Sequence, residues 1–265
     1  MPPLLQLKRL KKSFYSKSGF LASSKKAVHA VNDVSLDINK GEDIALIGES
    51  GSGKTTLARL IVKLFNVDSG NILFEGEDIT NLRAKAFKPY RSKIQMVFQD
   101  PYSSLDPRYL IKDILKEAML LLPNKYSSKD IMDEAMIKII KQVHLKKDML
   151  FRYPHEFSGG ERQRIAIARA LLMQPTLLLL DEAVSSLDVL VQKDILDLLA
   201  ELKHKQDLTY LFISHNLKVA QKLCAKMAVM YQGRIVEQGS CDDILKSPAD
   251  WYTRKLISAA MFKAS

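Results

Sequence analysis

The most regular feature of the chain is a series of short apolar runs that alternate with longer, more polar segments. Five runs of four or five residues lie at residues 44–47, 94–98, 177–180, 210–214 and 227–230. Residues 177–180 are four successive leucines, and such a run predicts a central strand that is covered on both faces. Strands that alternate with helices form parallel sheets through right-handed crossovers. The pattern therefore predicts an α/β core with a mainly parallel sheet.

The N-terminal part of the chain contains further strand patterns. Residues 4–12 and 28–38 are rich in leucine, valine and isoleucine, and they predict two strands joined by a polar loop. Residues 69–71 predict a turn that leads into a short strand at residues 72–76.

A long segment in the middle of the chain has helical rather than strand patterns. Residues 108–150 are rich in lysine, leucine, isoleucine and methionine, and Ser127 and Asp130 have the spacing of a capping box. Apolar positions then recur on one helical face, at Ile131, Ala135, Met136, Ile139, Ile140 and Val143. A second helix is expected at residues 161–173. A third, amphipathic helix is indicated by the apolar positions Val191, Ile195, Leu198, Leu199 and Leu202. The first of these segments predicts a helical insertion in the α/β core.

Length suggests one large domain or two small ones, and the sequence features together indicate a cytosolic protein. The chain has 265 residues, of which 47% are apolar. We expect a single domain over the whole chain, with an α/β core at about residues 1–98 and 166–265 and a helical subdomain at about residues 99–165. No apolar stretch approaches the roughly 20 residues that span a bilayer, and the N-terminus does not read as a signal peptide. Cys224 and Cys241 have neither metal nor disulfide spacing, which favours reduced thiols.

The chain is basic, with a formal net charge of +10. Such a balance is typical of proteins that meet nucleic acid or an anionic membrane surface, and it also occurs on an ordinary solvated surface. No basic tract is interleaved with aromatic residues in the way that stacks bases, so nucleic acid is the minority interpretation.

The strongest chemical motif follows the first apolar run of the core. Residues 48–55 read GESGSGKT and match G-x-x-x-x-G-K-[ST] between a predicted strand and a predicted helix. Glycines let backbone N–H groups surround phosphates, and the helix adds its unpaired N–H groups and the positive end of its dipole. Lys54 can reach the β- and γ-phosphates, and the Thr55 hydroxyl can bind Mg²⁺. The candidate nucleotide-binding residues of this loop are Gly48, Glu49, Ser50, Gly51, Ser52, Gly53, Lys54, Thr55 and Thr56.

Two carboxylates directly follow the run of four leucines. Asp181 and Glu182 are therefore expected at the carboxyl edge of the sheet, where open α/β sheets bind their ligands. Asp181 can hold Mg²⁺ through water, and Glu182 can polarise a water for in-line attack on a γ-phosphate. The alternative, a simple acidic pair on the surface, fits poorly with a position directly after four leucines.

Three further features are weak signals when each is taken alone. Residues 158–160 read SGG before a helix, and they offer an anion site made of a hydroxyl, N–H groups and a helix N-terminus, although Ser-Gly-Gly is common in turns. Gln99 follows a strand and is a candidate ligand for water or Mg²⁺. His215 follows another strand and can contact a γ-phosphate, although a lone histidine at a strand end is more often structural.

Residues 13–19 are expected to form the loop between the first two strands, and they contain the adjacent aromatics Phe14 and Tyr15. One ring can stack on a base, or both rings can be partly buried at a strand end. The spacing leaves both interpretations open.

Taken in order, the motifs GESGSGKT, FQDP, FSGGERQR, LLLLDEAVSSLD and ISH resemble the ATP-binding subunit of ABC transporters over nearly the whole chain. The resemblance implies a P-loop NTPase core with a mainly parallel, RecA-like sheet, an antiparallel β subdomain and an inserted α-helical subdomain. It also implies an ATP hydrolase that works with ATP and Mg²⁺.

The resemblance assigns a role to each candidate residue. Residues 48–55 look like the Walker A loop. The catalytic positions are Glu182, His215 and Gln99. The Mg²⁺ positions are Thr55, Gln99 and, through water, Asp181. The ATP-binding positions outside the loop are Asp181, Phe14 as the adenine-stacking aromatic, and Ser158, Gly159 and Gly160 as the signature motif. Tyr15 is close enough to Phe14 to compete for the stacking role.

Finer stretches resemble the oligopeptide, dipeptide and nickel importer ATPases, namely FQDPYSSLDPR, DEAVSSLDVLVQ, VMYQGRIVEQG and SPADWYTRKLISA. This likeness implies import of peptides or related small solutes. The implied partners are a second ATP-binding subunit, expected to be a related chain in a heterodimer, two transmembrane permease subunits and, indirectly, an extracytoplasmic solute-binding protein. The chain would lie peripherally on the cytoplasmic face of the inner or cell membrane.

The chain departs from the family pattern at two positions. Glu161 follows Gly160 where the signature usually has glutamine, and Ala183 stands where the subgroup usually has proline. A carboxylate near a γ-phosphate would repel it unless the carboxylate faces away or pairs with Arg162 or Arg164.

Two alternatives keep the ATPase and change its task. A soluble ABC ATPase that acts on nucleic acid or ribosomes is one, and the ATPase of another ABC transporter class is the other. Soluble members usually carry two cassettes or a long coiled-coil insertion, whereas this chain has one cassette and a short insertion. We therefore expect no direct contact with nucleic acid.

Overall fold

The computed structural model describes residues 2–16, 26–122 and 124–262. The chain forms two compact units, which are Met1–Phe87 together with Leu211–Ser265, and Lys88–Tyr210. The boundaries of these units differ from those of the expected core and helical subdomain. The expected domain scheme therefore stays a prediction. The fold class itself is confirmed: strands and helices alternate, with a parallel sheet, an antiparallel sheet and a group of helices.

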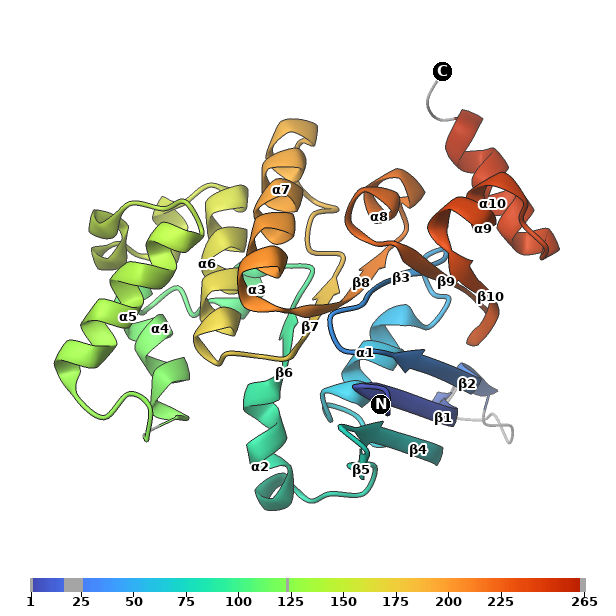
Figure 1. Ribbon diagram of the computed structural model, residues 1–265, viewed down its shortest axis with the longest axis horizontal. Helices are drawn as coiled ribbons and strands as arrows, with labels where there is room; N and C mark the ends of the chain where they lie inside the picture. Colours follow the sequence, from blue (N-terminus) through green and yellow to red (C-terminus); the bar gives the residue numbers. More distant parts are fainter. Residues whose placement is uncertain (1, 17–25, 123, 263–265) are drawn as a thin grey trace. The chain divides into compact units, whose positions relative to one another are not determined.

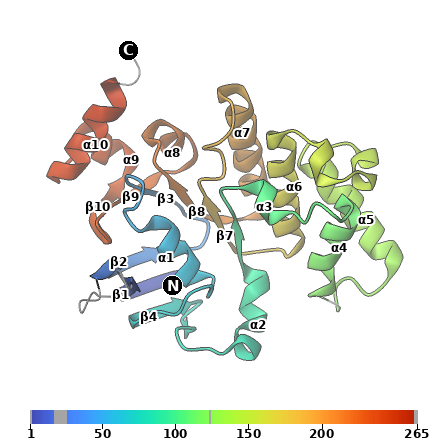
Figure 2. The same cartoon turned by 180° about the vertical axis from the view of Figure 1, so that it is seen from behind.

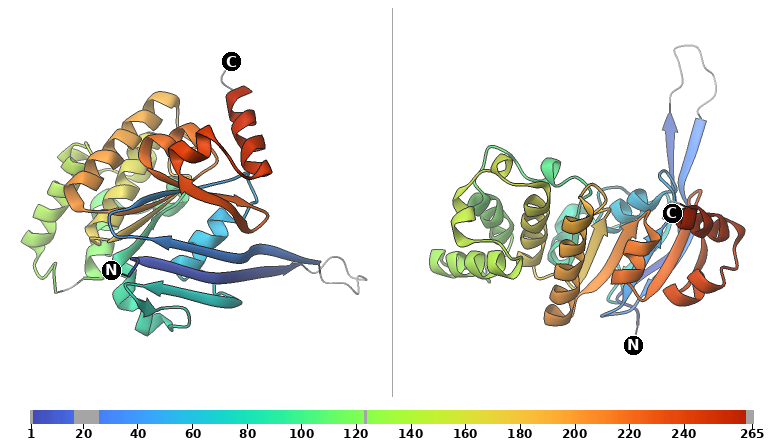
Figure 3. Two further views of the ribbon diagram at one scale, coloured as in Figure 1. Left: turned by 45° about the vertical axis from the view of Figure 1, so that its right-hand side comes forward. Right: turned by 90° about the horizontal axis from the view of Figure 1, so that it is seen from above.

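The first unit contains an antiparallel sheet with the strand order β2-β1-β4-β5 (Figure 1). Its strands are β1 (Leu5–Ser16), β2 (Lys26–Ile38), β4 (Ser69–Phe74) and β5 (Glu77–Asp78). Strands β1 and β2 lie side by side as a long ribbon (Figure 3). Leu5, Leu7 and Leu10 of β1 are almost fully buried, and these leucines are among the apolar positions that predicted the strand.

Two turn predictions in this sheet are wrong. Residues 13–16 continue β1 instead of forming a loop, because they pair with residues 26–29 of β2. Residues 17–19 of the expected loop lie outside the described residues. Residues 69–71 belong to β4, and the turn comes after the strand, at Glu75 and Gly76, which both have positive φ angles.

The first unit also holds strands of a second sheet, in the order β10-β9-β3-β8. They are β3 (Asp43–Ile47), β8 (Thr209–Ser214, which enters this unit at Leu211), β9 (Lys226–Tyr231) and β10 (Arg234–Ser240). Strand β3 is parallel to β9 and every residue of it is buried, as its apolar run predicted. Strand β10 is antiparallel to β9 and was not predicted, because its residues are mostly half-buried and show no alternation.

Four helices complete the first unit. They are α1 (Lys54–Ile61), α8 (Leu217–Leu223), α9 (Cys241–Lys246) and α10 (Trp251–Phe262). Helix α8 packs against β3, and α9 and α10 pack against β10 (Figure 1). The two helices α9 and α10 therefore both pack against the edge strand β10.

The second unit is mainly helical. Its elements are β6 (Ile94–Val97), α3 (Pro101–Ser104), α4 (Ile111–Leu120), α5 (Lys129–Gln142), the 3₁₀ helices η1 (Lys147–Phe151) and η2 (Pro154–Glu156), α6 (Gly159–Leu172), β7 (Leu177–Asp181) and α7 (Val189–Gln206), and α2 (Ala84–Lys93) leads into it. Helices α4, α5 and α6 pack on one another (Figure 2). Strand β6 is parallel to β7, and all residues of β7 are buried, as the four leucines predicted.

The start of α5 differs by one residue from its prediction. Ser128, and not Ser127, is the N-cap, and its hydroxyl accepts a hydrogen bond from the Ile131 N–H at 3.3 Å. Ile131 itself is 42% exposed, so it does not belong to the buried face. Met136, Ile139 and Ile140 are buried as expected, because they continue the face that meets α4 and α6.

Two properties of the described residues bear on the expected location and chemistry. None of their helices is long and apolar enough to cross a membrane. Both cysteines are buried free thiols, and Cys241 Sγ donates to the Cys224 carbonyl oxygen at 3.1 Å. Burial raises the pKa of the Cys241 thiol to about 11, so this thiol stays protonated at neutral pH.

Candidate nucleotide site

The glycines of the phosphate loop are required by close backbone contacts. A Cβ atom at Gly48 would collide with the carbonyl oxygen of Met230 in β9. A Cβ atom at Gly53 would collide with the carbonyl oxygen of Ala30, and Gly53 also has a φ of 109°, in the left-handed region that favours glycine. The loop after β3 therefore lies directly on neighbouring backbone, which leaves no room for side chains at these two positions.

Lys54 lies inside this loop and holds it together. Its side chain is 4% exposed. Its ammonium group donates to the Gly48 carbonyl oxygen at 2.7 Å, to the Glu49 carbonyl oxygen at 2.9 Å and to Ser52 Oγ at 3.3 Å. A buried ammonium in the middle of a phosphate loop supplies the positive charge that a triphosphate needs.

The start of α1 offers further donors to an anion. Gly53 is its N-cap, so no side chain caps the helix there, and its first turn contains no acidic residue. Lys54, Thr55 and Thr56 form that first turn, with their N–H groups at the positive end of the helix dipole. This donor set fits the phosphates of a nucleotide, and the Thr55 hydroxyl is an oxygen ligand of the kind that Mg²⁺ prefers.

The second unit holds the carboxylate part of the candidate site. Asp181 is the last residue of β7 and is 3% exposed. Glu182 follows in a left-handed conformation with a φ of 47°, which is unusual for a residue with a side chain. Gln99 Nε2 donates to Glu182 Oε2 at 3.1 Å, so the structure brings these two predicted residues together. The strained backbone and this hydrogen bond both orient the Glu182 carboxylate.

The Ser-Gly-Gly segment begins α6 within the same unit. Ser158 is its N-cap, and a Cβ atom at Gly160 would collide with Val191 Cγ1 of α7. Gly159 lies near Leu187, with only 3.3 Å from its ideal Cβ position to the Leu187 side chain. The segment therefore packs on the turn that follows Glu182, and Gly160 is needed for this close approach.

Glu161 completes a capping box with Ser158. Its carboxylate Oε2 accepts the Ser158 N–H and the Ser158 hydroxyl, each at 2.9 Å, while Ser158 Oγ accepts the Glu161 N–H at 3.3 Å. Arg162 donates to the Pro154 carbonyl oxygen and Arg164 to the Val143 carbonyl oxygen. The two arginines proposed as partners of Glu161 thus bond elsewhere, and the carboxylate turns back onto the serine.

Replacing Glu161 tests this capping box. We expect Glu161→Ala to lower the free energy of unfolding by about 1 kcal/mol, because the Ser158 N–H loses its acceptor, whereas Glu161→Gln retains one and costs less. Urea denaturation measures both values. Glu134→Ala, on the exposed face of α5, is the matched control and should leave the stability almost unchanged. Equal losses for Glu161→Ala and Glu134→Ala would contradict a stabilising role of the box.

The remaining predicted residues lie in the first unit. Phe14 in β1 is 38% exposed and meets Phe65 edge-on with ring centroids 5.4 Å apart, while Tyr15 is 67% exposed. Both side chains are thus partly exposed, and Lys12 Nζ lies over the Phe14 ring at 5.6 Å from its centroid. His215 is exposed directly after β8, just before Asn216, which caps α8 with its side chain.

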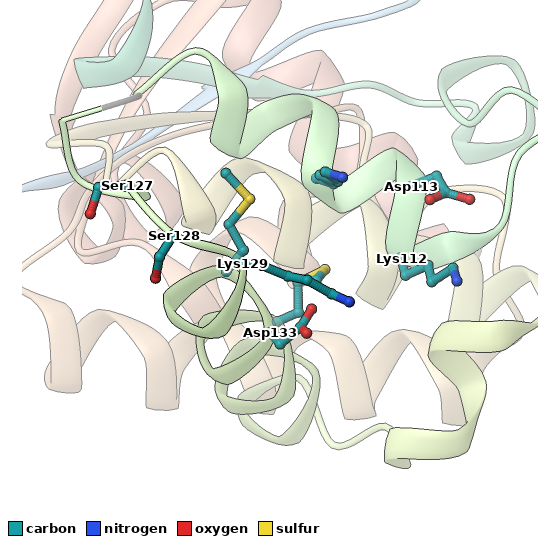
Figure 4. Close-up of a pocket in the computed structure, with 9 residues that line it drawn as sticks. Lys112, Asp113, Ser127, Ser128, Lys129 and Asp133 are labelled. Carbon is teal, nitrogen blue, oxygen red and sulfur yellow. The ribbon is translucent and has the colours of Figure 1, made fainter.

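A cavity of about 370 Å³ lies between α4 and α5, and no predicted site residue lines it. Figure 4 shows Lys112 and Asp113 on α4 together with Lys129 and Asp133 on the first turns of α5. Its lining contains both lysines and aspartates, so charges of opposite sign partly offset one another. This cavity is separate from the candidate nucleotide residues.

Sequence reasoning missed the contact between the phosphate loop and α10. The hydroxyl of Tyr252 in α10 accepts the Glu49 N–H at 3.0 Å. Tyr252 belongs to the SPADWYTRKLISA stretch, which marked the importer subgroup without suggesting a role. No local pattern could have found the contact, because the two residues lie far apart along the chain.

Comparisons with known proteins agree with this geometry. Residues 31–185 match the family described as ABC transporter. The chain is 46% identical to the oligopeptide transport ATP-binding protein OppF of Streptococcus mutans, over 88% of this chain and 75% of that protein. It is 43% identical to the dipeptide transport ATP-binding protein DppF of Lactococcus lactis, over 91% of this chain and 77% of that protein. The dimeric structure of the ATP-binding cassette MJ0796 bound to ADP and Pi is similar with a TM-score of 0.76 and 26% identity, over 89% of this chain and 98% of that one.

Proposed function

The chain belongs to the ABC transporter family, and on that premise we propose that it is the ATP-hydrolysing subunit of an ABC importer for peptides or related small solutes. The observation that carries the proposed chemistry is the Gln99–Glu182 hydrogen bond at the end of β7, which orients a carboxylate directly after a buried strand. The similarity to oligopeptide and dipeptide transport ATP-binding proteins supports the cargo class.

The proposed roles follow from the chemistry of each group. Lys54 and the N–H groups at the start of α1 hold the phosphates, and Phe14 stacks on the adenine. Glu182 accepts a proton from the attacking water, while His215 contacts the γ-phosphate. Thr55, Gln99 and, through water, Asp181 would hold Mg²⁺, which would supply positive charge to the phosphate oxygens. The donor types present in the chain fit these tasks.

A single chain does not complete the site in this proposal. Ser158, Gly159 and Gly160 of one subunit close over the ATP that another subunit holds, and the dimeric neighbour supports such a pairing. Because Glu161 already occupies the N–H and the hydroxyl of Ser158, a γ-phosphate must displace this carboxylate to gain those donors. A heterodimer has two composite ATP sites. When the related partner chain has glutamine at the position of Glu161, the site closed by this chain's signature therefore binds ATP more weakly than the other site.

The proposed assembly places this chain at the membrane beside other subunits. The partners are a related ATP-binding chain and two transmembrane permease subunits, and this chain lies peripherally on the cytoplasmic face of the inner or cell membrane. A solute-binding protein outside the membrane delivers the cargo to the permeases. ATP binding draws the two ATPases together and hydrolysis releases them, which switches the permeases between two accessible states.

Affinity purification from solubilised membranes of the native host tests this assembly. We expect two multi-spanning permeases and a second ATP-binding chain to copurify with the tagged protein. The Lys54→Ala variant is a useful companion, since it should retain the permeases while it loses nucleotide. Recovery of ribosomes or DNA in place of permeases would overturn the importer proposal in favour of a soluble ABC ATPase.

A further inference from the structure

The C-terminal part of the first unit reaches back to the phosphate loop through one buried tyrosine. Tyr252 is 1% exposed, and its hydroxyl oxygen accepts the Glu49 N–H at 3.0 Å. Glu49 is the second residue of the loop, directly after Gly48. The bond therefore ties α10 to the backbone whose neighbouring N–H groups are proposed to hold phosphate.

Several interactions fix the position of Tyr252. Asp250 Oδ1 caps α10 by accepting the Tyr252 N–H at 2.8 Å. Glu237 of β10 accepts the N–H groups of Ala249 and Asp250 at 2.8 and 3.1 Å, which anchors the start of the helix to the sheet. The Tyr252 ring lies on the ring of Tyr231 with centroids 4.2 Å apart. Asp250 and Glu237 thus fix the backbone at the start of α10, and Tyr231 fixes the Tyr252 ring. The hydroxyl therefore has little freedom to move away from the loop.

The same C-terminal segment supports the loop at a second point. Gly233, in the turn between β9 and β10, donates its N–H to the Ser52 carbonyl oxygen at 2.9 Å. Gly48 meanwhile lies against the Met230 carbonyl group at the end of β9. Tyr252 and Gly233 therefore form hydrogen bonds to two different residues of the loop, Glu49 and Ser52. Lys54 meanwhile donates to carbonyl oxygens inside the loop.

We propose that Tyr252 is a positioning residue for ATP: its hydroxyl holds the Glu49 N–H and so fixes the phosphate loop in its binding conformation before the nucleotide arrives. The inference rests on the proposed function, in which this loop binds ATP. A loop that is ordered in advance loses less conformational freedom on binding, so its affinity is higher. Without the hydroxyl, the Glu49 N–H is left without its acceptor, and the loop backbone at Gly48 and Glu49 becomes more mobile.

The substitution Tyr252→Phe removes this acceptor and retains the ring that packs on Tyr231. We expect the Kd for ATP·Mg²⁺ to rise about three- to tenfold, which corresponds to the contribution of one hydrogen bond to binding. The melting temperature without nucleotide should change little. Calorimetric titration of the full chain with ATP·Mg²⁺ measures the Kd. Tyr231→Phe is the matched control, because the Tyr231 hydroxyl bonds only the Gln232 side chain among the contacts the structure records, and its Kd should equal that of the wild type.

Hydrogen exchange gives a second measurement that does not depend on nucleotide. The amide of Glu49 should exchange slowly in the wild type and much faster in Tyr252→Phe, whereas amides in β3 should be unchanged. A residue with only a structural role would lower the melting temperature of the variant and leave both the Kd and this local protection as they were.

The outcomes separate this inference from the proposed function. If the wild type does not bind ATP·Mg²⁺, the proposed function fails and the inference fails with it. If the wild type binds and Tyr252→Phe binds equally well, only the positioning role of Tyr252 is overturned. An equal loss of affinity in Tyr231→Phe would also overturn it, since the effect would then come from the aromatic cluster.

Discussion

Replacing Glu182 by glutamine is expected to lower ATP turnover by at least about 100-fold while ATP still binds. Glutamine has the shape of glutamate and can still accept the hydrogen bond from Gln99 Nε2 through its amide oxygen. It cannot accept a proton from the attacking water, so the variant isolates the chemical step. Phosphate release from the assembled transporter measures the turnover, and titration with ATP measures binding.

A surface carboxylate provides the control for Glu182→Gln. Glu201 in α7 pairs with Lys205 and His144 and lies outside the candidate site, so Glu201→Gln should keep the turnover of the wild type. Near-normal hydrolysis by Glu182→Gln would contradict its assignment as the catalytic base. Loss of ATP binding in the same variant would instead show that Glu182 holds the nucleotide.

Replacing Lys54 by alanine is expected to weaken ATP binding itself, by about 10- to 100-fold. The variant removes a buried ammonium from the loop, and with it the charge that meets the β- and γ-phosphates. It also removes the bonds from Lys54 to the carbonyl oxygens of Gly48 and Glu49, so the loop itself becomes less ordered. Calorimetric titration with ATP·Mg²⁺ reads out the Kd.

Lys218→Ala is the control for Lys54→Ala. Lys218 is an exposed lysine of α8, and its removal changes the net charge by the same amount without touching the loop. Its Kd for ATP should match that of the wild type. An unchanged Kd in Lys54→Ala would contradict the role of the loop, and an equal loss in both variants would indicate a general charge effect.

Taken together, the two predictions assign different tasks to Lys54 and Glu182. Lys54 lies in the first unit and is expected to govern binding, whereas Glu182 lies in the second unit and is expected to govern hydrolysis. Purified chain is sufficient for the first measurement, but the second needs the assembled transporter because the proposed site is shared between subunits.

Several elements could be predicted from the sequence because their cause is local. The runs that became β3 and β7 are apolar on both faces, and a strand of that composition is stable only when it is buried. The phosphate loop was found because its glycines, its lysine and its threonine occur at fixed spacing between a strand and a helix. The collisions at Gly48 and Gly53 supply the physical reason for the glycines.

Other elements were decided by partners that are distant along the chain. Residues 13–16 are a strand because residues 26–29 pair with them, whereas the serines on either side of Phe14 and Tyr15 interrupt the apolar pattern of β1. Strand β10 exists because it pairs with β9 across a turn, although its half-buried residues carry no alternation. Either Ser127 or Ser128 suits a helix start, and the structure selects Ser128, whose hydroxyl accepts the Ile131 N–H.

The sequence by itself determined the chemical types in the candidate site: a glycine-rich loop with Lys54, a carboxylate pair after a buried strand, and a Ser-Gly-Gly segment before a helix. Only the tertiary structure decided which groups meet. Gln99 contacts Glu182, Glu161 turns back onto Ser158, and the Tyr252 hydroxyl reaches the Glu49 N–H. Composition and periodicity report which face of an element is buried, whereas a hydrogen bond between distant residues depends on how the whole chain brings single donors and acceptors within about 3 Å of each other.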